Sequence, residues 1–309
     1  MKATTTTPKN VYQMVTDRII AQMEQGIIPW HKPWHGILGK RSSEDCAVSY
    51  ESGRPYSLLN QFLLGEPGEY ATFNQIKARG GMIRKGEKSR MVVFYTQIMK
   101  EDTDRKDEDG NPKVVSIPVL KYYNVWNINQ CEGLAARWEG SKQPEAPQTE
   151  PLEAAEAIVA GYMASANHPR LEVKISDRAF YRPATDEVVV PMLSQYDDAA
   201  EYYSTAFHEL THSTLKKSRC NREGDNARAF FGNHEYSREE LVAEMGAAML
   251  CSNAGIDSDR AFRNSVAYIQ NWMQALKNDP KMIVWAASRA EKAARYIIGG
   301  PEAIKVSTL

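Results

Sequence analysis

The stretch "YSTAFHELTHSTLKKS", residues 203–218, contains two histidines four residues apart, with a glutamate directly after the first. On an α-helix, residues i and i+4 lie on one face a turn apart, so His208 and His212 can direct ring nitrogens at one point about 2 Å from each. Glu209 lies one residue further round the helix, where its carboxylate can reach a water beside a metal without being a ligand. The stretch therefore predicts a metal site with a general base.

The spacing alone also occurs by chance, and two histidines on a solvated helix would show it. The surrounding residues favour the metal site, because "AEYYSTAF" and "STL" continue a helical pattern on both sides of the motif. Tyr203, Phe207 and Leu210 can supply the buried face of that helix. This is the HExxH geometry of metallopeptidases, in which the glutamate takes a proton from water that then attacks a carbonyl.

A third protein ligand is expected, because two imidazoles and a water leave a zinc site one ligand short. In the helical run "SREELVAEMGAAML", Glu240 and Glu244 are also four residues apart. This resembles the gluzincin arrangement, which implies Glu240 as third ligand and Glu244 as the carboxylate that orients one of the histidines. The two roles could be exchanged, Glu239 is a weaker option, and in the alternative these glutamates only cap and solubilise a helix. Zinc is the expected metal, and manganese or cobalt would fit the same ligands.

Two further segments belong to the predicted site. His234 and Tyr236, in "GNHEYSREE", could donate hydrogen bonds to an oxyanion or could equally be surface loop residues. The stretch "FYRPATDEVVVP", residues 180–191, is expected to form the strand along the edge of the cleft, where a peptide could add by β-augmentation.

The length of 309 residues predicts about two domains, and a Pro-rich polar segment marks the boundary. The expected organisation is a first domain over 1–138, a linker over 139–152 and a second domain over 153–309. Both domains are expected to be α+β. The first should contain a helix over 11–26 and an antiparallel pair of strands over 89–99 and 114–128 around an acidic loop that turns at 110–112. The second should contain strands over 172–177 and 187–191, and helices over about 153–167, 197–216, 237–254, 260–276 and 281–299.

Composition excludes several classes of protein. No window is apolar enough for a membrane span, and the N-terminus lacks the apolar run of a secretion signal, so a cytoplasmic protein is expected. Four cysteines without CxxC pairing suggest reduced thiols, with neither a disulfide framework nor a cysteine-ligated zinc cluster. The net charge of -1 does not identify a partner, because the charges are locally segregated.

Aromatic and basic residues alternate in two stretches of the first domain, "IIPWHKPWHG" (27–36) and "EYATFNQIKARGGMIRKGEKSRMVVFY" (69–95). Residues 72–100 hold seven basic residues and one acid, 7 - 1 = +6. Single-stranded nucleic acid favours this pairing, because bases stack on aromatics for about 1–3 kcal/mol each while Lys and Arg neutralise phosphates. In the alternative, the aromatics are core and the lysines a solvated face. The predicted DNA-binding residues are Trp30, Trp34, Tyr70, Phe73, Lys77, Arg79, Arg84, Lys85, Lys88 and Arg90.

Together, "IIPWHKPW", "YATFNQIKARGGMIRKGEKS", the Pro-rich linker and "AFHELTHST" with "REELVAEMGAA" resemble the ArdC-type antirestriction proteins of conjugative plasmids. The N-terminal module is also similar to that of plasmid TraC primases. The resemblance implies an N-terminal single-stranded DNA-binding domain joined to a C-terminal zincin-like metallopeptidase domain. It further implies that the protein shields incoming plasmid DNA from host restriction enzymes during conjugation.

Two other functions fit the same residues. One is a DNA-activated metalloprotease that cleaves a DNA-associated protein or a restriction enzyme. The other is a peptidase-like domain whose metal is purely structural. The sequence leaves the oligomeric state open.

Overall fold

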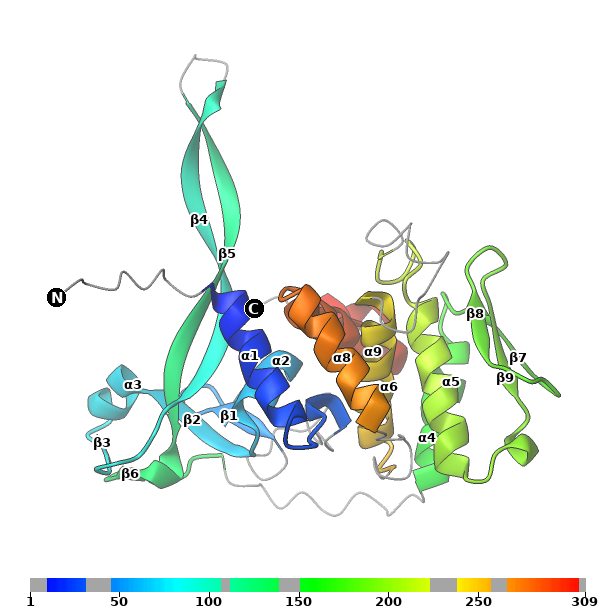
Figure 1. Cartoon of the computed structure of the whole chain (residues 1–309), viewed down its shortest axis with the longest axis horizontal. Coiled ribbons are helices and arrows are strands. Elements are labelled where there is room, and N and C mark those ends of the chain that lie inside the picture. Colours follow the sequence, from blue (N-terminus) through cyan, green and yellow to red (C-terminus); the bar gives the residue numbers. More distant parts are fainter. Residues whose placement is uncertain are drawn as a thin grey trace.

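The computed structural model describes residues 10–31, 46–106, 112–138, 151–222, 238–256 and 266–305. These residues form an α+β structure with a sheet at each end and helices between them, which confirms the predicted fold class (Figure 1). The four cysteines are buried and free, as expected for reduced thiols. None of the helices in the described segments is long and apolar enough to cross a membrane.

The N-terminal part is built on a four-stranded sheet with the order β1-β2-β5-β4. Its strands are β1 (Ala47–Ser49), β2 (Gly68–Thr72), β4 (Arg90–Lys106) and β5 (Pro112–Asn127). Around it lie α1 (Val11–Met23), η1 (Pro29–His31), α2 (Leu58–Leu64), α3 (Phe73–Ala78), η2 (Ile128–Gln130) and the small pair β3 (Met82–Ile83) and β6 (Cys131–Glu132).

The predicted antiparallel pair is present and is longer than expected. Strands β4 and β5 pair continuously from Arg90 opposite Val125 to Asp102 opposite Lys113. The outer half of this hairpin extends away from the rest of the molecule (Figure 1). Most of the turn expected at 110–112 lies outside the described residues.

The C-terminal part places a three-stranded sheet beside a group of helices. The strands are β7 (Arg170–Lys174), β8 (Phe180–Arg182) and β9 (Glu187–Pro191). The remaining elements are α4 (Pro151–Met163), η3 (Leu193–Gln195), α5 (Ala199–Ser213), α6 (Arg238–Asn253), α8 (Val266–Asn278) and α9 (Met282–Lys305). Helix α4 begins inside the segment 139–152 that was expected to be a linker, and residues 139–150 are outside the described part of the chain.

The prediction of one edge strand over 180–191 is wrong. The stretch turns at Asp186, which has a φ of 52°, and so forms a hairpin of β8 and β9. Strand β9 lies in the centre of the sheet, paired in parallel with β7 and antiparallel with β8. Its five residues are all buried and it is paired on both sides, so β9 has no free edge for a peptide, and the edges of the sheet belong to β7 and β8.

The two parts share one hydrophobic core. Ile19 and Met23 of α1 belong to the same buried cluster as Leu276 of α8 and Ile283 of α9. Two polar contacts join the parts as well: the Thr16 hydroxyl donates to the carbonyl of Pro280 at 2.9 Å, and the Leu58 amide donates to Glu291 at 2.8 Å. The N-terminal helices therefore pack directly on the helices that follow the metal motif.

Candidate metal centre

Helix α5 presents the HExxH motif. It begins after Asp198, whose side chain accepts a hydrogen bond from the Ala200 amide at 2.8 Å and so caps the helix. Tyr203, Phe207 and Leu210 are buried, which confirms the apolar face expected from the sequence. The polar side chains of the motif lie on the opposite face of α5.

Helix α6 lies close enough to α5 for its side chains to meet those of the motif. A Cβ atom at Gly246 would lie 2.5 Å from Cγ2 and 2.7 Å from Oγ1 of Thr211, so only glycine fits at this crossing. Thr211 is fully buried, and its hydroxyl donates to the Phe207 carbonyl at 2.7 Å. The close packing of the two helices sets the distance between the histidines and the glutamates of α6.

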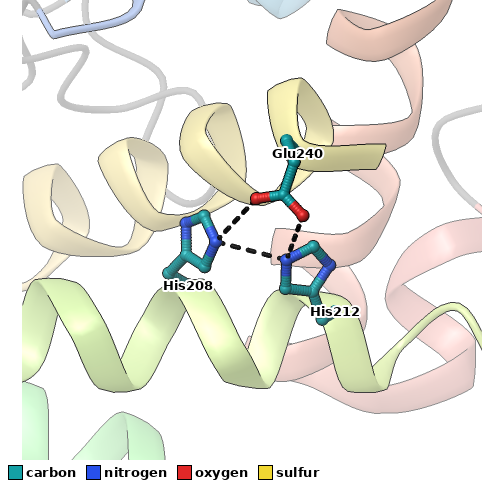
Figure 2. A group of neighbouring side chains, drawn as sticks. All are labelled: His208, His212 and Glu240. Carbon is teal, nitrogen blue, oxygen red and sulfur yellow. Dashed lines mark hydrogen bonds and ion pairs between the residues drawn. The ribbon is translucent and has the colours of Figure 1, made fainter. Parts of the chain in front are cut away.

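His208, His212 and Glu240 converge on one point between the two helices (Figure 2). The two Nε2 atoms lie 3.2 Å apart. Glu240 Oε2 lies 3.4 Å from His208 Nε2, and Oε1 lies 3.5 Å from His212 Nε2. The carboxylate of Glu240 thus faces both rings, as expected of a residue that binds the same metal ion as the two histidines.

These spacings fit a tetrahedral metal. With metal–ligand bonds of about 2.0–2.1 Å, the ligand atoms of a tetrahedral site are about 3.3–3.4 Å apart. The two Nε2 atoms are 3.2 Å apart, and each is 3.4 or 3.5 Å from one oxygen of Glu240, so these separations lie within 0.2 Å of that value. The donor set of two imidazoles and a carboxylate suits a divalent metal with one position open to water.

The surrounding charges favour a cation at this point. Burial by itself lowers the pKa of His212, but Glu239, Glu240 and Glu209 reverse this effect and raise it to about 10. Burial likewise opposes ionisation of Glu240, yet the two histidines hold its pKa well below the usual range. A field that would stabilise a proton on His212 also stabilises a metal ion bound in its place.

Glu239 contacts the ring of His212 from the other side. Its Oε1 lies 3.6 Å from His212 Nδ1, slightly beyond hydrogen-bond distance. Glu239 is buried and receives two hydrogen bonds from Arg222, at 2.7 and 3.1 Å. Arg222 also donates to the Thr214 hydroxyl at 2.8 Å. The sequence predicted Glu239 only as a weak third ligand and did not indicate Arg222; the two adjacent glutamates of "SREEL" were the available signal.

Glu244 lies one turn beyond Glu240 on α6. Burial raises its pKa, and the nearby imidazole of His208 opposes that shift. Its carboxylate also helps to raise the pKa of Tyr268, which is raised mainly by burial. Glu244 is therefore near His208, whereas the carboxylate at Nδ1 of His212 is that of Glu239.

Glu209 follows His208 on α5 and is half-buried. Its charge helps to raise the pKa of His212. It also contributes to the raised pKa of Tyr196, for which burial is the main cause. Tyr196, which follows η3, is a neighbour of the site that the sequence did not indicate. The two predicted oxyanion donors, His234 and Tyr236, lie outside the described residues.

Two of the predicted DNA-stacking residues are wrong, because their rings are buried. Trp30 is 1% exposed and packs edge-on against Trp272 with ring centroids 6.2 Å apart. Tyr70 is also 1% exposed, on β2, inside the cluster that contains Val92 and Val125. Neither ring has a face free for a base. Phe73 is 55% exposed at the start of α3, and Trp34 lies outside the described residues.

The basic residues of the same segment are on the surface, but carboxylates offset three of them. Arg79 pairs with Glu51 at 2.8 Å, Arg84 with Glu87 at 3.2 Å, and Arg90 with Glu66 at 2.8 Å. Lys77, Lys85 and Lys88 are exposed. The local charge of the segment is therefore smaller than its sequence suggests, because Glu51 and Glu66 come from outside it.

The chain is similar to known proteins over both of its parts. Residues 9–126 match the family model described as the N-terminal domain of anti-restriction factor ArdC, and residues 153–289 match that of a zincin-like metallopeptidase. The metal-free crystal structure of the antirestriction protein ArdC from plasmid R388 is 33% identical, with a TM-score of 0.66, over 94% of this chain and 97% of that one. The chain belongs to the ArdC family of antirestriction proteins.

This ArdC family member is also similar to a second structure and to three curated sequences. The Mn(II)-bound structure of the R388 protein matches equally well, with a TM-score of 0.66 and 33% identity. Two Escherichia coli proteins named DNA primase TraC are 30% and 31% identical over 94% of this chain, which spans 20% and 27% of their lengths. An uncharacterised protein, y4eC, of Sinorhizobium fredii is 29% identical, and the chain covers 92% of it. The family and the zincin-like domain predicted from the sequence are thus confirmed, and such a domain implies a divalent metal.

Proposed function

We propose that His208, His212 and Glu240 bind a divalent metal ion and that Glu209 is the general base beside it. The observation that carries this proposal is the convergence of the three side chains: the two Nε2 atoms lie 3.2 Å apart, and each lies 3.4 or 3.5 Å from one of the two oxygens of Glu240. Zinc suits this ligand set, and manganese or cobalt would also fit it. Glu244 is proposed to brace His208 from the far side.

The chemistry of such a site is hydrolysis of a carbonyl compound such as a peptide. A metal held by His208, His212 and Glu240 would supply Lewis acidity for the carbonyl and would make a neighbouring water more acidic. Glu209 follows His208 on the same helix as both histidines, and its carboxylate would accept the proton of the attacking water. The same carboxylate then returns that proton to the leaving amine.

For the whole protein, we propose an antirestriction function in which the N-terminal part binds single-stranded DNA. The protein would thereby protect incoming plasmid DNA from host restriction during conjugation. Support comes from the family: an ArdC antirestriction protein matches over nearly the full length of both chains. Exposed Phe73, Lys77, Lys85 and Lys88 remain candidate contacts for DNA.

The alternative is a DNA-activated metalloprotease that cleaves a DNA-associated protein or the restriction enzyme itself. This alternative is supported by the complete HExxH motif and by Glu240, which converges on the two histidines as a third ligand would. The two functions differ in what they require of Glu209, because binding does not need a general base and peptide hydrolysis does.

The test is conjugation into a restricting recipient that expresses wild-type protein, Glu209→Gln, or no protein. Metal content and single-stranded DNA binding are measured on both purified proteins. Equal protection by Glu209→Gln supports an antirestriction function that lies in binding. Loss of protection with metal and DNA binding intact would establish the protease, and the restriction enzyme would be the first substrate to examine. A wild-type protein that gives no more protection than the empty recipient would reject the antirestriction function.

A further inference from the structure

A cavity of about 740 Å³ lies where the base of the β4–β5 hairpin meets α2 and α9. We call it the hairpin groove. Phe94, Tyr123 and Tyr56 line one side, and Val284 and Ser288 of α9 line the other. Its volume falls within the range of about 300–1,000 Å³ that is typical of ligand sites. The groove is separate from the metal centre, whose ligands are not among its lining residues.

The aromatic side of the groove offers ring surface to a ligand. Phe94 is 44% exposed and Tyr123 is 47% exposed, although both are large apolar rings. Their centroids are 5.9 Å apart at an interplanar angle of 64°, and Tyr56 lies 6.2 Å from Phe94. Rings fixed against one another in this way lose little conformational freedom when a planar ligand stacks on them.

Cationic side chains flank these rings. Arg54 lines the groove and is exposed, and no carboxylate of the described residues pairs with its guanidinium. Lys121 is exposed and lies directly opposite Phe94 in the register of β4 and β5, so the two side chains share a face of the sheet. A ligand that combines planar rings with negative charge is complementary to this arrangement.

Among the described residues, Glu291 supplies the carboxylate that lines the groove, and its charge does not oppose this complementarity. Glu291 is buried, accepts the Leu58 amide at 2.8 Å and pairs with Arg295 at 3.0 Å. Its charge is therefore balanced inside the protein. The exposed cations Arg54 and Lys121 therefore determine the charge at the opening of the groove.

We propose that the hairpin groove binds the bases of single-stranded DNA, with bases stacked on Phe94 and Tyr123 and phosphates near Arg54 and Lys121. The proposal rests on the DNA binding proposed above and gives it a location. That location differs from the basic segment expected from the sequence, where two aromatic rings are buried and three arginines are paired. Stacking needs no particular base, so binding is expected to be largely independent of sequence.

The test measures binding of the full chain to a fluorescent single-stranded oligonucleotide by anisotropy. The variants are Phe94→Ala and Tyr123→Ala, and the matched control is Tyr122→Ala. Tyr122 is the neighbouring residue on β5 and is 45% exposed, but it points to the other face of the strand and does not line the groove. Because all three rings are exposed, folding should survive each change, and thermal melting verifies this.

Each groove variant is expected to weaken binding about 5- to 150-fold, the equivalent of one lost base stack, and Tyr122→Ala less than 2-fold. Tyr123→Phe should bind like wild type, because it keeps the ring. Arg54→Gln should flatten the slope of log affinity against log salt by about 0.7, the value for one phosphate contact on a single strand.

Two outcomes would overturn the proposal, and they are distinguishable. If wild type binds but the groove variants match Tyr122→Ala, the groove is not the DNA site while the proposed function stands. Loss of binding only in Lys85→Glu with Lys88→Glu would then locate DNA on the basic segment. If wild type itself binds no single-stranded DNA, both the groove assignment and the proposed DNA binding fail. As a direct readout, ultraviolet crosslinking should attach the oligonucleotide to peptides containing Phe94 or Tyr123.

Discussion

The buried pair of Arg222 and Glu239 gives a prediction that separates stability from metal binding. Both side chains are buried, and the guanidinium donates to both carboxylate oxygens, at 2.7 and 3.1 Å. Removing one partner of a buried pair generally costs about 3–5 kcal/mol, because the other charge is left uncompensated. In metal-free protein, His212 lies 3.6 Å from Glu239 and supplies a second cation. We therefore expect Arg222→Met to lower the free energy of unfolding by the lower end of that range, about 3 kcal/mol.

The double variant Arg222→Met with Glu239→Leu removes both charges and fills the space with apolar atoms. Such replacements are often neutral, so most of the lost stability should return. The double variant should nevertheless bind metal more weakly than wild type. Without Glu239 there is no carboxylate at Nδ1 of His212 to hold the ring, and loss of such a partner typically weakens metal binding about 10- to 100-fold.

Urea unfolding in the presence of a chelator measures the first quantity, and calorimetric titration with Zn²⁺ or Mn²⁺ measures the second. Glu239→Gln is the control that keeps the shape of the side chain. A single Arg222→Met variant that loses less than about 1 kcal/mol would refute the buried-pair argument. A double variant that binds metal as tightly as wild type would refute the role given to Glu239.

Three further predictions concern Gly246, Asp186 and Trp30. Gly246→Ala should push α6 away from Thr211 and cost about 1–3 kcal/mol, seen as a lower urea midpoint, together with weaker metal binding; an unchanged affinity would mean that the helix crossing does not set the ligand distances. Burial by itself would raise the pKa of Asp186, but hydrogen bonds from Arg219, Lys216 and Tyr181 lower it to about 2. The ionised carboxylate therefore contributes its full stabilisation of the fold above the unfolded pKa near 4, and this contribution is lost as pH falls through 2. Asp186→Asn, which tolerates the positive φ, should therefore cost about 1–2 kcal/mol at pH 6 and about half as much at pH 3, and a pH-independent difference would contradict this. Trp30→Ala should lower stability by about 3–5 kcal/mol without altering DNA affinity below the melting temperature, and a selective loss of DNA binding would return Trp30 to the interface.

The sequence predicted the metal helix and its partner helix because their periodicity is local. His208 and His212 share a face at any ordinary helix geometry, and Glu240 needed only a second helix to approach the first. What no local pattern could give is the contact at Gly246 or the pairing of Arg222 with Glu239, since both depend on how two helices cross.

The DNA-binding prediction failed in part for the same reason. Alternating aromatic and basic residues do not reveal which aromatic side chains the rest of the chain covers. Trp30 is covered by α8, which lies near the other end of the sequence. The sequence could have indicated Phe94 and Tyr123. Side chains alternate between the two faces of a strand, so each of these rings lies on the face opposite to that of its neighbours in the sequence.

The common core of α1, α2, α8 and α9 determines how the protein should respond to limited proteolysis and to heating. A proteolytic nick within residues 139–150 would cut the chain between its two family modules but would leave this core intact. The two fragments should then stay associated and elute together, and separating them should require denaturant. Heating should likewise produce a single cooperative transition, because neither fragment can unfold without exposing the apolar surface of the other.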